Sequence, residues 1–127
     1  MNHELYLLDL QADLCQSLGH AIRLQIIHIL KTSPKSVNEI SLEVGLPQST
    51  ISRHLSVLRS NGILTAHRKA QEVFYEIVNP KVVEVCEMMR NILAERETQR
   101  LDLLNYFQGE GLGLITEEVP YVPQHTS

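Results

Sequence analysis

The sequence predicts a mainly α-helical fold with one small β-hairpin, in the order α-α-α-α-β-β-α. Apolar residues recur at spacings of three and four in several segments, and one stretch near the middle is rich in β-branched and aromatic residues. The chain has 127 residues, 43% of them apolar, so it can bury one core and has little material for a second. We expect one folded domain over residues 1–108 and a flexible tail over residues 109–127.

The first two helices are predicted from their leucine and isoleucine patterns. Residues 4–18 form a broadly apolar helix that needs more than one partner surface, and Gly19 ends it. A second helix follows from Ile22 and ends near Lys31, before the Thr32-Ser33-Pro34 turn. Both helices therefore offer apolar faces for packing.

The next two helices form a pair joined by a tight turn. Ser36 and Glu39 have the spacing of a capping box that opens a short third helix, and Gly45 is placed to end it. The fourth helix runs from about Pro47 to Ser60, and Asn61-Gly62 terminates it. A short helix, a glycine turn and a second helix are the outline of a helix-turn-helix.

A hairpin and a long helix complete the domain. Residues 63–68 and 73–78 read as two strands that flank Lys69-Ala70-Gln71-Glu72, the pattern of a wing. Asn79-Pro80 supplies an N-cap and a proline at the first helical position of a last helix, which reaches about Phe107. The elements together predict a winged helix-turn-helix.

The distribution of charge is more informative than its sum of −4. Between His20 and Gln71 seven lysines and arginines stand against two carboxylates, and between Leu46 and Gln71 there is no carboxylate at all. A locally positive surface can therefore exist on an acidic protein and attract phosphate groups. Chance clustering on a solvated face is the alternative.

The fourth helix is the candidate DNA-reading element. It is about 20 Å long and fits the major groove if its seam of Ile51, Leu55 and Leu58 faces the core. Arg53 can then pair with guanine and Gln48 with adenine, whereas His54 is expected to pack against the core and to reach a phosphate. The candidate DNA-binding residues of this helix are Gln48, Ser49, Thr50, Ser52, Arg53, His54 and Ser56. On the hairpin, Arg68, Lys69 and Gln71 are placed to touch the backbone or the minor groove.

Three separated segments resemble the signatures of the ArsR family of repressors. They are Leu18-Gly19-His20-Ala21-Ile22-Arg23-Leu24, Gln48-Ser49-Thr50-Ile51-Ser52-Arg53-His54-Leu55-Ser56-Val57-Leu58-Arg59 and Val73-Phe74-Tyr75. The resemblance implies a homodimer assembled through the first and last helices, bound to a pseudo-palindromic operator on double-stranded DNA until an effector releases it. Pro47 departs from the polar residue common at that position, which puts side-chain capping of the fourth helix in doubt.

The metal sites usual in that family do not match this sequence. The third-helix cysteine site would fall near Ser36, Asn38 and Ser41, and the last-helix zinc site near Asn79, Lys81, Ile92 and Glu95. Of these residues Glu95 alone could serve as a ligand, and zinc requires several at once. We therefore expect none of the usual family metal sites.

Cys15 and Cys86 are the remaining candidates for an effector site, on the first and last helices. Two thiolates could bind a soft metal or metalloid ion such as arsenite or copper(I), or could undergo reversible cysteine oxidation to a disulfide or persulfide. Both also sit on apolar stripes, where a cysteine commonly serves as a small buried hydrophobe. The sequence leaves these three interpretations open.

Two other functions compete with DNA binding as interpretations of the sequence. A protein-docking or constitutive dimerisation module would expose aliphatic or aromatic residues on the fourth helix, where this chain has serine and arginine. A thiol oxidoreductase would require an activated cysteine, and there is no CxxC motif or nearby histidine and aspartate arrangement. We expect no enzyme activity, no membrane segment and a cytoplasmic location.

Overall fold

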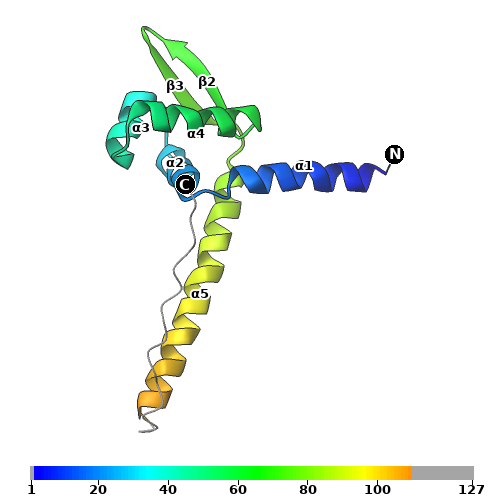
Figure 1. Ribbon diagram of the computed structural model, residues 1–127, viewed down its shortest axis with the longest axis vertical. Coiled ribbons are helices and arrows are strands. Elements are labelled where there is room, and N and C mark those ends of the chain that lie inside the picture. The colour runs from blue at the N-terminus through cyan, green and yellow to red at the C-terminus, as the bar shows by residue number, and fades with distance from the viewer. Residues whose placement is uncertain (1, 110–127) are drawn as a thin grey trace. The chain divides into compact units, whose positions relative to one another are not determined.

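The computed structural model describes residues 2–109 and confirms the predicted fold class. Its helices and the two strands of the hairpin follow one another in the predicted order (Figure 1). One short strand, β1, is added. The elements are α1 (His3–Ser17), α2 (Ala21–Leu30), β1 (Lys35–Ser36), α3 (Val37–Val44), α4 (Gln48–Ser60), β2 (Leu64–Lys69), β3 (Glu72–Ile77) and α5 (Lys81–Gly109).

Side chains define the starts of α2 and α3. His20 is the N-cap of α2, and its Nδ1 accepts a hydrogen bond from the backbone N–H of Ile22 at 3.1 Å. The predicted capping box of α3 is present, with Ser36 and Glu39 each bonding the other's backbone N–H. Gly45 ends α3 in the left-handed conformation, at φ 79°. The turn between α3 and α4 is therefore fixed by its own sequence.

The sheet has three antiparallel strands rather than two. The central strand β3 pairs with β2 from Leu64↔Ile77 to Lys69↔Glu72, and on its other edge with β1, where Lys35 faces Tyr75. The sequence did not reveal β1 because two residues are too short to show an alternating pattern. Its pairing ties the start of α3 to the middle of β3.

The core lies where α2, α3 and α4 meet the base of the hairpin. Its largest fully buried side chains are Ile26, Ile27, Ile40, Ile51, Leu55, Leu58 and Ile63. The three residues predicted as the inward seam of α4 are all among them. Burying seven such side chains, at roughly 1.5–3 kcal/mol each, fixes which face of α4 remains outside.

The chain divides into two compact units, the first ending at Val83 and the second beginning at Glu84. The first contains the winged helix-turn-helix, and the second contains most of α5. In the first unit, α1 exposes apolar residues such as Leu5, Leu7 and Leu8, each more than half accessible. In the second unit α5 exposes Val85, Met88, Ile92 and Leu101 in the same way. The predicted tail lies outside the described residues, apart from Gly109, the last residue of α5.

Candidate DNA-binding surface

The face of α4 opposite its buried seam is polar and open to solvent. Gln48, Ser49, Ser52, Arg53 and Ser56 are all exposed, whereas Thr50 and His54 are half-buried along one flank of the helix. A helix carries residues three and four apart on one side, so the side chains at 49, 52, 53 and 56 share a stripe. These small hydroxyls and one guanidinium allow close approach of a ligand and offer it hydrogen-bond donors.

The helix α4 begins without a side-chain capping bond. Pro47 is the N-cap and makes no side-chain capping bond, in line with the doubt raised by the sequence. The Gln48 side chain instead donates from Nε2 to Oδ1 of Asn38 on α3, at 3.0 Å. The Ser41 hydroxyl donates to the backbone carbonyl of Leu46 in the same turn. The helix pair is thus joined by side-chain bonds across the turn.

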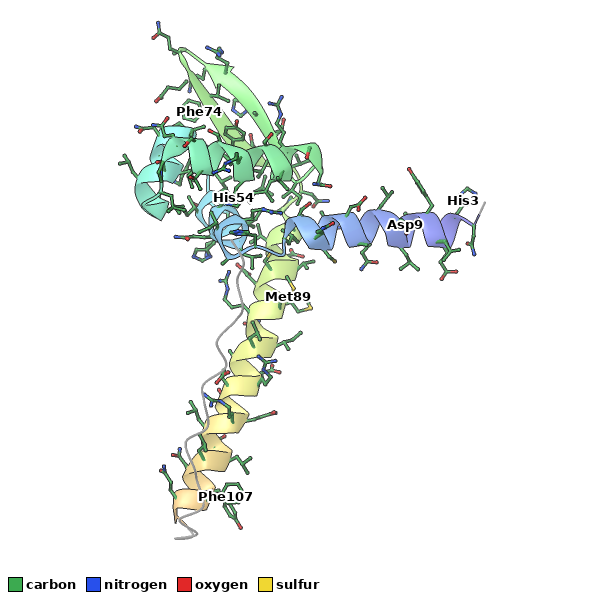
Figure 2. The ribbon with its side chains drawn as sticks, viewed as in Figure 1. His3, Asp9, His54, Phe74, Met89 and Phe107 are labelled. Carbon is green, nitrogen blue, oxygen red and sulfur yellow. The ribbon has the colours of Figure 1, made fainter. Side chains whose placement is uncertain are left out.

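His54 belongs to a cluster of nitrogen-bearing side chains beside α4. Arg23 on α2 donates from Nε to the Nδ1 of His54 at 3.3 Å, and the His20 and His54 ring centroids are 4.4 Å apart. Figure 2 labels His54 on α4, with side chains of α2 next to it. Arg23 also donates from Nη1 to the backbone carbonyls of Gln16 and Ser17, at 3.4 and 3.0 Å. Arg23 therefore links the end of α1 to α2 and α4.

Burial lowers the pKa of His54 below its ordinary value of 6.5, and electrostatic interactions with His20, Arg23 and Arg53 act in the same direction. His20 and Arg23 lie on the α2 side and Arg53 on α4 itself. His54 is half-buried at this place, and its contact with DNA stays a prediction. His20 and Arg23 are not among the residues that the sequence predicts to touch DNA, although Arg23 is one of the seven lysines and arginines between His20 and Gln71.

The hairpin presents the predicted wing residues to solvent. Arg68 and Lys69 end β2 and Gln71 lies in the two-residue loop, all exposed. Ala70, the first loop residue, has φ 59°, as the favoured two-residue hairpin turns require. Glu72 is the register partner of Lys69, so a carboxylate lies next to the positive tip.

Cys15 and Cys86 differ in their exposure to solvent. Cys15 on α1 is exposed and Cys86 on α5 is buried. Burial raises the pKa of the Cys86 thiol, with Arg90 opposing that shift and Glu87 adding to it. The two residues lie in different units. Within residues 2–109, no three histidine, cysteine or carboxylate side chains come together as a metal site.

None of the helices between residues 2 and 109 is long and apolar enough to cross a membrane.

The family model described as bacterial regulatory protein, arsR family, matches residues 20–66. That stretch contains α2, the whole helix-turn-helix and the first half of β2.

Relatives match over a longer part of the chain. An uncharacterized HTH-type transcriptional regulator of Mycobacterium tuberculosis is 32% identical over 106 residues, 83% of this chain and 93% of its own length. The biofilm growth-associated repressor of Xylella fastidiosa is 31% identical, over 69% of this chain and 77% of its own. A homodimeric winged helix-turn-helix DNA-binding domain of Mycobacterium bovis, solved by NMR, has a TM-score of 0.69 at 26% identity and covers 75% of this chain and 88% of that one.

The order of the elements, the helix-turn-helix with its wing and these similarities agree with one another. ArsR-family proteins are regulators of transcription rather than enzymes. The chain belongs to the ArsR family of winged helix-turn-helix transcriptional regulators.

Proposed function

We propose that the protein is a homodimeric repressor that binds a pseudo-palindromic operator through α4 and the wing. The observation that carries this proposal is the division of α4 into two faces. Ile51, Leu55 and Leu58 are completely buried, so the serines and Arg53 on the opposite side must face outward. Protein-docking surfaces are depleted of serine and enriched in aromatic residues, whereas this face carries three serines and no aromatic side chain.

The proposed contacts fall into two groups. Arg53 forms a bidentate pair with guanine and Gln48 pairs with adenine, while Ser49, Ser52 and Ser56 bond bases or phosphates beside them. Thr50 and His54, on the half-buried flank, face the sugar-phosphate backbone. Arg68, Lys69 and Gln71 of the wing touch the backbone or the adjoining minor groove, which fixes the orientation of the protein on DNA.

A homodimer is proposed because α1 and α5 expose more apolar surface than a solvent-facing helix normally carries. Leu5, Leu7 and Leu8 on α1, and Met88 and Ile92 on α5, are all more than half accessible. An exposed apolar surface of this extent indicates an interface. The structure similar to this chain from Mycobacterium bovis is homodimeric. Two copies would set their α4 helices about 34 Å apart, one turn of DNA.

Repression is proposed from the likeness to the biofilm growth-associated repressor. Release from the operator would follow from a thiol-directed effector, either a soft metal or metalloid ion or an oxidant, acting at Cys15 and Cys86. Cys15 is the accessible thiol of the two. Cys86 is buried with a raised pKa, so it would react only after a local opening of the protein.

Fluorescence anisotropy tests the proposal directly. Reduced full-length protein is titrated onto DNA from upstream of its own gene and onto a random duplex of equal length. Tight binding to the first alone, with a stoichiometry of two chains per site, is the expected result. Binding to neither duplex would favour the docking-module alternative, in which the winged helix serves protein contact.

The effector is tested in the same assay. The complex is exposed separately to arsenite, copper(I), peroxide and polysulfide, and the titration is repeated with Cys15→Ser and Cys86→Ser. Release by one agent that both substitutions abolish is the expected result. A complex that no agent disturbs would leave both cysteines as structural residues. Reporter transcription with and without the protein distinguishes repression from activation.

A further inference from the structure

A pocket of about 430 Å³ lies beside α4 and is lined by His20, Arg23, Thr50, Arg53, His54 and Val57. Four of these six residues carry nitrogen-based side chains that can donate hydrogen bonds, and Thr50 adds a hydroxyl. None of the six is a carboxylate. Asp13 lines a second pocket, which shares Arg23 and Val57 with this one. The pocket therefore has the composition of an anion site.

The hydrogen bonds within the cluster determine which donors remain for a ligand. Nδ1 of His20 accepts from the Ile22 N–H, and Nδ1 of His54 accepts from Arg23 Nε. An imidazole nitrogen that accepts carries no proton, so each neutral ring has its proton on Nε2. Both rings are thus held with Nε2 as a donor.

Arg23 is fixed more firmly than a surface arginine. Its Nε and Nη1 groups are engaged by His54 and by the carbonyls of Gln16 and Ser17. The positive charge of the guanidinium is not neutralised by an ion pair with any residue of the described chain. A fixed charge with several donors oriented around it stabilises an anion at little entropic cost.

The position of the pocket indicates the source of the anion. Arg53 and Thr50 belong both to the pocket and to the region of α4 that faces outward or flanks that face. A duplex lying against Ser49, Ser52 and Ser56 would bring one strand of its backbone along this flank. His20, Arg23 and His54 would then lie on the same side of the protein as the bases that α4 reads.

We propose that His20, Arg23, Thr50 and His54 seat one phosphate group of the DNA backbone in this pocket, while Arg53, which also lines it, pairs with guanine. This inference rests on the proposed function and adds to it a defined contact made by residues outside the helix-turn-helix. The seated phosphate couples α2 and the end of α1 to the position of α4 in the groove, because Arg23 contacts all three. It fixes the register of the protein on DNA without reading a base.

His54→Asn is the variant that tests the pocket. The asparagine Oδ1 can accept the Arg23 Nε–H in place of Nδ1, whereas the donor at Nε2 is lost. His54→Gln places an amide nearer to Nε2 and is expected to restore part of the affinity. His3→Asn is the matched control. His3 is exposed and begins α1, whereas Arg23 bonds the carbonyls of Gln16 and Ser17 at the other end of that helix. Urea unfolding of each variant shows that the fold is retained.

The full-length protein is titrated onto its promoter duplex and onto duplexes in which single phosphates are replaced by neutral methylphosphonates. In the wild type, one replacement in each half-site is expected to weaken binding about tenfold, the loss of one hydrogen-bonded charge contact. His54→Asn is expected to bind the unmodified duplex about tenfold more weakly, and the methylphosphonate at that phosphate is expected to weaken its binding by a smaller factor than it weakens wild-type binding. His3→Asn should behave as the wild type does.

Three outcomes would overturn the inference. If the wild type binds promoter DNA and His54→Asn binds it equally well, the pocket seats no phosphate while the proposed function stands. If the wild type binds no DNA, both fail together. If millimolar inorganic phosphate moves the His20 and His54 ring signals in NMR spectra but no methylphosphonate affects His54→Asn differently from the wild type, the pocket takes free phosphate and the DNA assignment is wrong.

Discussion

Gln48 Nε2 donates a hydrogen bond to Oδ1 of Asn38 at 3.0 Å, and this bond joins α3 to the first turn of α4. The Gln48 amide nitrogen has a second hydrogen, and the amide oxygen remains available as an acceptor. One donor and one acceptor are what a bidentate pair with adenine requires. Asn38 can therefore orient Gln48 through one Nε2 hydrogen and leave the other hydrogen and the amide oxygen for a base.

Asn38→Ala is expected to weaken specific binding by about 0.5–1.5 kcal/mol, the usual contribution of one hydrogen bond, and to leave binding to random DNA unchanged. The reason is that Gln48 loses its fixed orientation. Anisotropy titrations of Asn38→Ala, Gln48→Ala and the double variant form a cycle that isolates the interaction. A double variant that loses the sum of both single effects would show that Asn38 and Gln48 act independently.

Arg53→Ala is expected to cost roughly 1–3 kcal/mol per site on the operator and to relax the requirement for guanine at one position. Arg53→Lys is the matched variant, because it keeps the charge and loses the planar pair of donors. It should retain affinity for random DNA and still lose discrimination. Equal losses on operator and random duplexes would instead assign Arg53 to the backbone.

The sequence predicted the larger part of the fold because its signals were local. The capping box of Ser36 and Glu39, the glycine at position 45 and the isoleucine-leucine seam of α4 each depend on residues a few positions apart. The strand β1 escaped prediction because its evidence is a partner 38 to 40 residues away, in the pairs Lys35↔Tyr75 and Ser36↔Phe74. Two residues carry too little pattern to identify such a strand.

The candidate site shows the same division between local and distant information. The outward stripe of α4 follows from helical periodicity once Ile51, Leu55 and Leu58 are assigned to the core. The cluster around His54 could not be predicted, because Arg23 lies 31 residues before it. Periodicity on α4 gives the side on which His54 lies, and tertiary packing alone gives its partners.

The wing contributes sequence-independent affinity if its contacts are to phosphates. Arg68→Ala or Lys69→Ala is expected to weaken binding to every duplex and to reduce the salt slope by about one, since each phosphate contact releases condensed counterions. Lys31→Ala, an exposed lysine just after α2, serves as the control for a general loss of charge. Unchanged slopes for both wing variants would remove the hairpin from the DNA contacts.

The lowered pKa of His54 predicts that acid destabilises the free protein. Above an unfolded-state pKa of 6.5, His54 is neutral in both states and its contribution to stability is complete. As the pH falls below that value, the unfolded chain takes up a proton more readily than the folded one, so the free energy of unfolding decreases until the folded pKa is passed. Protonation of Nδ1 would also break the hydrogen bond from Arg23.

His54→Gln is expected to lose less stability than the wild type when the pH is lowered from about 7.5 to about 5.5, because the unfolded chain no longer gains a proton at position 54. Urea unfolding of both proteins at the two pH values measures this difference, and the remaining five histidines are common to both chains. The variant should be the less stable protein at the higher pH, where the Arg23–His54 bond is intact in the wild type. Parallel losses in the two proteins would mean that acid acts on another group, and the cationic surroundings of His54 would then have no consequence for folding.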